Sequence, residues 1–228
     1  MSEPKRMHCQ ERLLGDLKVL VGNKNPLDEI IGMWSNGKMY RYSTSAHLPV
    51  LWALCRGLNA RKIGEIGFGR SSFVLAYTAQ HMGASVICCD RYDYSYMLRL
   101  CDPEGKLPVR FIVGDADAFY ADPEVRLGMD FLFLDYMSTR DMTEDMCYHD
   151  LKRAIGLVPI NGIVAVHDAL SSKYNVAGAM NRLSDKYKRG VEMVTLPYGY
   201  GLGIIRNRMK SPFGIIEDGW HKSEDSHE

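Results

Sequence analysis

Two glycines separated by one residue follow an acidic residue in the segment Glu65-Ile66-Gly67-Phe68-Gly69. The apolar run over 62–66 predicts a strand, and helical spacing begins at Ser72. Glycines at such a junction let the backbone turn tightly and let a ligand approach the main chain, although a plain strand–helix turn has the same appearance. The third glycine of the dinucleotide-binding pattern is missing, because Ser72 stands at its position. The segment therefore predicts a cofactor-binding turn that is less suited to a pyrophosphate.

Acidic residues also follow the next three apolar runs, at Asp90, Asp115 and Asp135. Asp90 lies 21 positions after Gly69, where an acidic side chain can accept hydrogen bonds from both hydroxyls of a ribose. Helix N-capping accounts for any one of these carboxylates, but it does not explain the whole series. A row of carboxylates suits a ligand that has a cationic amine or sulfonium and an unphosphorylated ribose.

The elements that must position these residues alternate between short apolar runs and segments with helical spacing. Such alternation predicts a doubly wound α/β fold with a mostly parallel sheet and right-handed crossovers. The last two apolar runs are separated by a short turn at Pro197-Tyr198-Gly199, so they must pair antiparallel as a hairpin. Seven strands are expected, at 62–66, 85–89, 109–113, 131–134, 163–166, 191–196 and 202–206.

Three regions are expected along the chain. Residues 1–42 predict helices outside the strand–helix repeat, and Trp34, Tyr40 and Tyr42 lie where a lid over the site would be placed. A packed N-terminal subdomain is an equal alternative for this region. Residues 43–208 form the ligand-binding domain, and residues 209–228 are a polar C-terminal tail.

Composition excludes several classes of protein. The chain has 228 residues, of which 46% are hydrophobic, and this is typical of a folded globular domain rather than a disordered chain. Lysine and arginine together number 28, as do aspartate and glutamate, so the chain lacks the basic field that non-specific binding of nucleic acid requires.

The compartment is inferred from what the sequence lacks. No apolar run approaches the length of a membrane span, and no signal peptide is recognisable at the N-terminus. The six cysteines contain no CxxC pair and are expected to be free thiols, mostly buried. A cytoplasmic protein is therefore expected, and the sequence leaves open whether it forms a homodimer.

Together these motifs resemble the class I S-adenosylmethionine-dependent methyltransferases over about residues 43–208. Within that class, Leu134-Asp135 and Val166-His167-Asp168 are similar to the small O-methyltransferase-like branch that includes macrocin and catechol-type enzymes. The resemblance implies S-adenosylmethionine as cofactor and a hydroxyl of a small molecule or sugar as acceptor. It implies that the cofactor is bound by Glu65, Gly67, Phe68, Gly69, Ser72, Asp90, Arg91, Asp115, Ala116 and Asp135.

The resemblance also implies a divalent cation, Mg²⁺, held by Asp135 and Asp168 to orient the acceptor and lower its pKa. Two departures weaken this expectation. Relatives in the branch read Ile-Asp-Gly-Asp-His where this chain reads Leu134-Asp135-Tyr136-Met137-Ser138, so a second carboxylate and the usual catalytic histidine are both replaced.

The remaining candidates for the catalytic base are His167, beside Asp168, and His149, beside Asp150, with Asp135 next to the reacting atoms. A structural role is an equal alternative for either histidine. Two other functions stay open at this point. One is a nicotinamide-dependent oxidoreductase of similar fold, and the other is a protein that binds cofactor or partner without catalysis.

Overall fold

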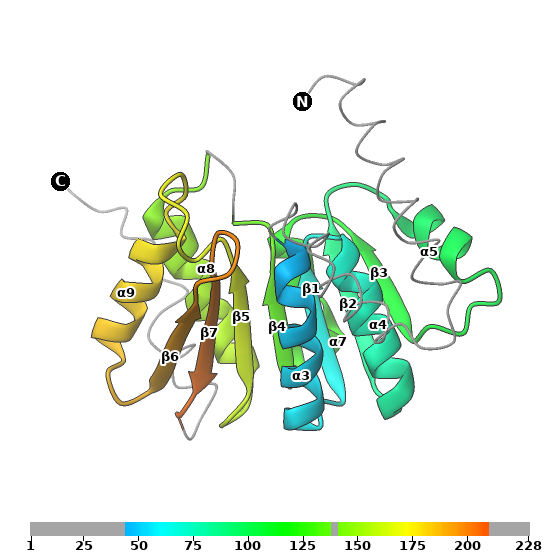
Figure 1. Ribbon diagram of the computed structural model, residues 1–228, viewed down its shortest axis with the longest axis horizontal. Coiled ribbons are helices and arrows are strands. Elements are labelled where there is room, and N and C mark those ends of the chain that lie inside the picture. The colour runs from blue at the N-terminus through cyan, green and yellow to red at the C-terminus, as the bar shows by residue number, and fades with distance from the viewer. Residues whose placement is uncertain (1–43, 138–140, 210–228) are drawn as a thin grey trace.

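The computed structural model describes residues 44–137 and 141–209. Within them a seven-stranded mixed sheet has the strand order β3-β2-β1-β4-β5-β7-β6 (Figure 1). The elements in chain order are η2 (Thr44–His47), α3 (Leu48–Leu58), β1 (Lys62–Ile66), α4 (Arg70–Met82), β2 (Ser85–Asp90), α5 (Ser95–Cys101), β3 (Val109–Val113), α6 (Ala116–Ala121), α7 (Pro123–Arg126), β4 (Phe131–Leu134), α8 (Glu144–Leu157), β5 (Ile163–His167), α9 (Val176–Lys186), β6 (Val191–Leu196) and β7 (Leu202–Asn207).

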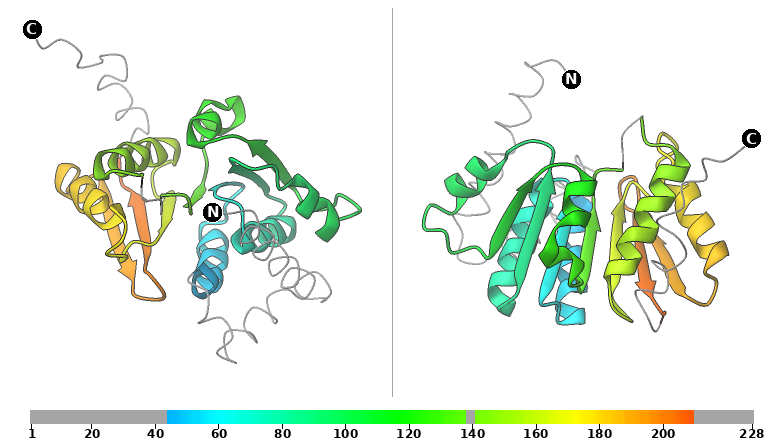
Figure 2. Two further views of the ribbon diagram at one scale, coloured as in Figure 1. Left: turned by 90° about the horizontal axis from the view of Figure 1, so that it is seen from above. Right: turned by 180° about the vertical axis from the view of Figure 1, so that it is seen from behind.

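Helices cover both faces of the sheet, with α3 and α4 on one face and α6 to α9 on the other (Figure 2). Strand side chains alternate between the two layers. Phe131 and Phe133 of β4 belong to the core beneath α3 and α4, whereas Leu132 and Leu134 belong to the core beneath α6 to α9. All four are fully buried, and a strand buried on both faces must be apolar throughout. This explains why continuous apolar runs mark the central strands in the sequence.

The sheet ends in the expected antiparallel hairpin. Strands β1 to β5 are parallel to one another, while β7 pairs antiparallel with both β5 and β6. The register places His167 opposite Leu202 and Ile163 opposite Arg206. The predicted doubly wound α/β fold with seven strands is therefore confirmed.

Polar side chains set the start of several helices. The Thr143 hydroxyl accepts a hydrogen bond from the Met146 amide at 3.2 Å at the start of α8, and Asp122 caps α7 by accepting from the Glu124 and Val125 amides. Such caps satisfy amide groups that have no partner inside the helix. Pro123 at the first position of α7 separates it from α6, so two short helices lie between β3 and β4.

Some predictions fall outside the described residues. They are the lid or subdomain over 1–42 and almost all of the tail over 209–228, and Ser138 lies outside the described residues as well. No helix in 44–137 or 141–209 is long and apolar enough to cross a membrane.

Gly67 is predicted to be essential for folding of the β1–α4 turn. Its φ is +101°, and a Cβ atom built on it would lie 2.7 Å from the carbonyl oxygen of Asp135. Gly67→Ala should therefore lower the free energy of unfolding by about 3 kcal/mol, because it adds both backbone strain and a backbone clash.

Gly69→Ala is the matched control, since a Cβ there meets no atom within 4 Å. It should cost less than about 1 kcal/mol, the usual loss on placing alanine at a helix N-cap. Urea denaturation of both variants measures the difference, and equal midpoints would contradict this account of the turn.

Candidate functional site

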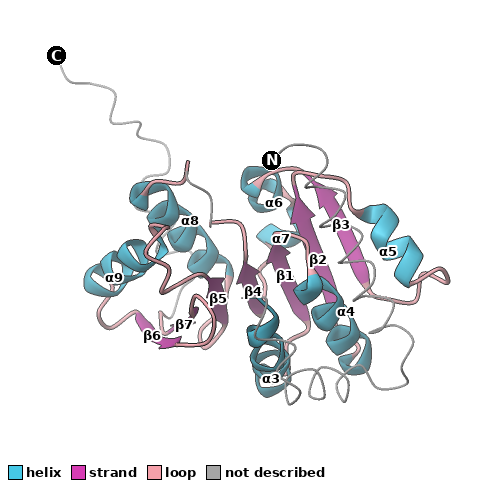
Figure 3. Cartoon of the chain, turned by 45° about the horizontal axis from the view of Figure 1, so that its top comes forward, coloured by secondary structure: helices cyan, strands magenta, loops and turns pink. Residues whose placement is uncertain are grey.

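The carboxyl ends of β1 to β5 meet at one edge of the sheet, which is turned forward in Figure 3. The chain winds outward from β1 through β2 to β3 and then returns to the opposite side of β1 as β4. Ligands of open α/β sheets bind in the crevice that forms where the strand order reverses in this way. In this chain the strand order reverses between β1 and β4, so the loops that follow these strands flank the expected position.

Glu65 lies beneath the β1–α4 turn and is completely buried. The Cys88 thiol donates a hydrogen bond to its Oε2 atom at 3.2 Å, whereas its Oε1 atom has no hydrogen-bond partner among the described residues. Burial raises the pKa of Glu65 to about 7, against the smaller opposing effect of nearby hydroxyl and thiol donors. Glu65 thus supports the turn from below and does not face solvent.

The two glycines of the turn have different surroundings. Gly67 lies against the backbone of Asp135, as described above, and its amide donates to the Cys89 carbonyl at 2.9 Å. Gly69 faces open space, and its amide donates to the Ser72 hydroxyl at 3.0 Å. The Ser72 hydroxyl therefore stabilises the start of α4, and the open space at Gly69 lets a ligand reach the main chain.

Asp90 accepts hydrogen bonds from both the loop that follows β1 and the loop that follows β2. Its Oδ2 atom accepts from the Phe68 amide at 2.9 Å, and its Oδ1 atom accepts from the Tyr92 amide at 3.0 Å. The side chain is partly exposed, and a carboxylate has about four lone-pair sites, so both oxygens can accept further hydrogen bonds. The ribose-binding role of Asp90 stays a prediction.

Aromatic rings surround the loop that follows β2. Phe68 stacks on Tyr94 with a centroid distance of 5.4 Å, and Tyr92 makes an edge contact with Tyr94 at 6.2 Å. Tyr92 is 48% exposed, and Arg91 is exposed as well. Phe68 is therefore held by packing, whereas Arg91 and Tyr92 are accessible to a ligand at Asp90.

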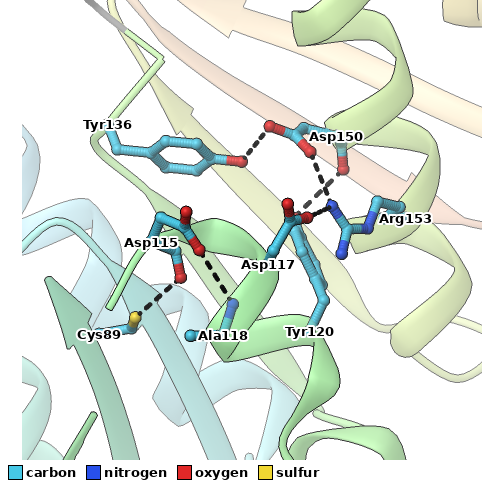
Figure 4. Close-up of polar contacts among 8 residues, drawn as sticks. All are labelled: Cys89, Asp115, Asp117, Ala118, Tyr120, Tyr136, Asp150 and Arg153. Carbon is cyan, nitrogen blue, oxygen red and sulfur yellow. Dashed lines mark hydrogen bonds and ion pairs between the residues drawn. The ribbon is translucent and has the colours of Figure 1, made fainter. Parts of the chain in front are cut away.

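Asp115 and Ala116 lie at the start of α6 (Figure 4). The Asp115 side chain accepts from the Ala118 amide at 3.1 Å, and its carbonyl accepts from the Cys89 thiol at 3.3 Å. The Asp115 carboxylate is thus a helix cap, which is the structural role that the sequence left open for it. It is also exposed, so capping does not prevent contact with a ligand.

A polar network that the sequence did not suggest connects the loop after β4 with α6 and α8 (Figure 4). The Tyr136 hydroxyl donates to Asp150 at 2.6 Å, and Arg153 pairs with both Asp150 and Asp117. The Arg153 guanidinium lies over the Tyr120 ring, 4.0 Å from its centroid. Burial raises the pKa of both Tyr136 and Asp150, so their hydrogen bond is sheltered from water. The network holds the backbone that carries Asp135.

His167 contacts two carboxylates at the carboxyl ends of β4 and β5. Its Nδ1 atom lies 2.8 Å from Asp135 Oδ1 and 3.3 Å from Asp168 Oδ2. His167 and Asp168 are almost fully buried, while the Asp135 side chain retains 20% of its exposure. Burial alone lowers the pKa of His167, but the two carboxylates more than offset this effect and raise it to about 9. His167 is therefore protonated at neutral pH.

His47, which the sequence analysis did not single out, completes this cluster. Its ring makes an edge contact with the His167 ring at 5.1 Å, and its Nε2 atom donates to the Tyr198 carbonyl at 2.9 Å. His47 is fully buried, and burial lowers its pKa. It precedes α3, outside the strand–helix repeat, so its spacing in the sequence gave no signal of this role.

The second candidate base, His149, is exposed on α8 and makes an edge contact with the neighbouring Tyr148 ring at 5.5 Å. No contact among the described residues joins it to the cluster of Asp135, His167 and Asp168.

The expected Mg²⁺ site is not supported by the donor set. No group of three or more His, Cys, Asp or Glu side chains in the described part of the chain could hold a metal ion. Both carboxylates expected as ligands, Asp135 and Asp168, are in contact with His167 instead. Mg²⁺ is commonly held by one or two carboxylates that contact it directly, but here the imidazole lies between both carboxylates, so these residues as arranged do not fit the ion.

Comparison with solved structures places the fold among Rossmann-like methyltransferases. A Staphylococcus aureus protein assigned to the caffeoyl-CoA O-methyltransferases matches with a TM-score of 0.57 at 18% identity, covering 87% of this chain and 99% of its own. An SAH-bound methyltransferase from Podospora anserina matches with a TM-score of 0.56 at 14% identity, covering 92% and 97%.

An O-methyltransferase from Bacillus cereus in complex with SAH gives a TM-score of 0.56 at 15% identity, covering 87% of this chain and 99% of its own. No protein-family profile matches the sequence, and comparison with curated proteins gives no significant match. The similarity therefore establishes the fold.

The buried Glu65 carboxyl predicts a stability that depends on pH. Its pKa is 4.5 ordinarily and about 7 in the folded chain, so between these values the folded state binds more protons than the unfolded state. The free energy of unfolding should fall as pH rises through this window, by up to about 3 kcal/mol.

Glu65→Gln, which cannot ionise, should lose this dependence and gain stability relative to the unchanged chain between pH 5 and pH 8. Urea midpoints at both pH values measure the effect. A difference between the two proteins that stays the same at both pH values would show that Glu65 does not titrate as described.

Proposed function

We propose that this protein is an S-adenosylmethionine-dependent methyltransferase that transfers the methyl group to a hydroxyl of a small molecule. The observation that carries the proposal is the pairing of the open Gly69 backbone with the partly exposed Asp90 carboxylate at the switch point of the sheet. The methyltransferase fold and the SAH bound in two solved relatives support the choice of cofactor.

In the proposed complex the cofactor lies along the carboxyl ends of β1, β2 and β3. Asp90 accepts the ribose hydroxyls, and the Phe68 to Gly69 backbone lies beside the amino-acid part. Asp115 and Ala116 lie at the adenine, with Arg91 and Tyr92 exposed at the rim. The cofactor would supply an electrophilic methyl group on a positively charged sulfur. The carboxylates of Asp90, Asp115 and Asp135 favour such a cation electrostatically.

The acceptor is proposed to lie at the ends of β4 and β5, beside Asp135. Methyl transfer is an in-line displacement, so the protein has mainly to align the hydroxyl with the methyl group and accept one proton. The partly exposed Asp135 carboxylate can accept a hydrogen bond from that hydroxyl and take up its proton as the new C–O bond forms and the bond from the methyl group to sulfur breaks. His167, already protonated at neutral pH, has no lone pair on Nδ1 to act as a base there. We therefore assign His167 as the positioning residue that holds Asp135.

The antiparallel β6–β7 hairpin favours this function over a nicotinamide oxidoreductase, whose sheet ordinarily ends in a further parallel strand. The missing third glycine, whose position Ser72 occupies, also favours it, because the turn is less suited to the pyrophosphate of a nicotinamide cofactor.

Asp90→Ala should weaken binding of S-adenosylmethionine by tenfold or more, because two hydrogen bonds to a charged carboxylate are lost, each worth about 1.5 to 3 kcal/mol. The matched control is Asp93→Ala, an exposed carboxylate in the same loop that also accepts a backbone hydrogen bond, from Ser95 at 2.8 Å. Equilibrium dialysis with labelled cofactor measures both, and circular dichroism confirms folding. Affinity equal to that of the unchanged chain in folded Asp90→Ala would refute the placement of the ribose.

The pH profile of methyl transfer tests the role of His167. If charged His167 holds Asp135, turnover should fall as pH rises through about 9, the pKa of His167. A general base would give the opposite result, with turnover rising through that pH. The measurement is transfer of labelled methyl groups to a panel of small phenols and sugars between pH 6 and pH 10.

His167→Gln should remove the alkaline limb and lower turnover by about a hundredfold, the usual scale for loss of a group that aligns the reaction, while the cofactor affinity changes little. The control is His81→Gln, on the exposed surface of α4. An unchanged pH profile in His167→Gln would remove His167 from the mechanism.

A further inference from the structure

The space between the two carboxylates at the ends of β4 and β5 is filled by a side chain of this protein. Asp135 Oδ1 and Asp168 Oδ2 both face the same atom, His167 Nδ1, at 2.8 Å and 3.3 Å. These are distances of ion pairs and hydrogen bonds, well beyond the 2.0 to 2.1 Å of Mg²⁺ to oxygen. The carboxylate oxygens that could bind a metal ion therefore contact His167 Nδ1 instead.

A second histidine, His47, also packs against the His167 imidazole. The His47 ring lies against the His167 ring at 5.1 Å, and His47 is tied to the β6–β7 turn through the Tyr198 carbonyl. Both histidines are buried, at 0% and 5% exposure. His47 and the β6–β7 turn therefore restrict the movement of His167.

The ligand count points the same way. The carboxylates of Asp135 and Asp168 both contact His167, and the described residues offer no group of three ligands for a metal. Mg²⁺ must complete an octahedral shell with further ligands or water, whereas an imidazole can lie between two carboxylates without them.

From this geometry we propose that the His167 imidazole takes the place of a divalent cation between Asp135 and Asp168, so that the carboxylates are organised by a residue of the chain itself. The role assigned to it, holding Asp135 toward the acceptor, rests on the function proposed above. The occupancy of the space by His167 does not, and it can be tested by metal binding alone.

The test is binding of Mn²⁺, which accepts the same oxygen ligands as Mg²⁺ and is followed by the loss of its free-ion electron paramagnetic resonance signal. The unchanged full-length chain should bind no Mn²⁺ at this position. His167→Asp replaces the imidazole with a third carboxylate and should bind Mn²⁺ at least about tenfold more tightly than the unchanged chain.

Two controls make the result specific. Adding Asp168→Asn to His167→Asp should abolish the new binding, because a ligand of the created site is lost. His81→Asp introduces the same change on the exposed surface of α4 and should bind no more Mn²⁺ than the unchanged chain does.

Two results would overturn the proposal. In one, the unchanged chain binds Mn²⁺ and Asp168→Asn loses that binding, so that the carboxylates hold a metal despite His167. In the other, folded His167→Asp binds no Mn²⁺, so that the space is not a cation position. If His167→Asp does not fold, the comparison of the unchanged chain with Asp168→Asn still decides. Failure of the proposed function would appear separately, as failure to bind S-adenosylmethionine.

Discussion

The backbone hydrogen bonds just beyond the end of β1 hold together the turn and the loop on which the candidate site is built. The Asp135 amide donates to the Ile66 carbonyl at 2.8 Å, and the Gly67 amide donates to the Cys89 carbonyl at 2.9 Å. These bonds extend the parallel pairing one step past the strands and hold the Gly67 turn between the ends of β2 and β4. Gly67 must be glycine because the Asp135 backbone lies so close. Asp90 then fixes the next residue of the turn through the Phe68 amide.

Five carboxyl groups lie at this edge of the sheet, and their charges would repel one another unless each were compensated. The chain does this differently at each strand. Burial favours the neutral form of Glu65, backbone amides compensate Asp90 and Asp115, and His167 compensates Asp135 together with Asp168. The carboxylates that stay accessible, Asp90, Asp115 and Asp135, are the ones available to a cationic ligand.

The fold followed from the sequence because its signals are local. Apolar runs, their alternation with helical spacing and the short Pro197 to Gly199 turn specify the strands and the hairpin. The acidic residues at the strand ends could be located for the same reason, since parallel strands end at one edge. The network of Tyr136 with Asp150 and the contact of His47 with His167 could not be predicted, because each joins residues whose neighbours in the sequence show no pattern. The contact of Asp135 and Asp168 with His167, in place of a metal ion, depends on distances within the folded chain. Such distances cannot be inferred from residue types alone.

The central claim is that the carboxyl edge of this sheet binds S-adenosylmethionine. Isothermal titration calorimetry of the full chain with S-adenosylmethionine, S-adenosylhomocysteine and NAD tests it most directly. The account predicts binding of both sulfur nucleotides with dissociation constants on the order of micromolar, and no binding of NAD. Binding of NAD alone, or of none of the three, would contradict it.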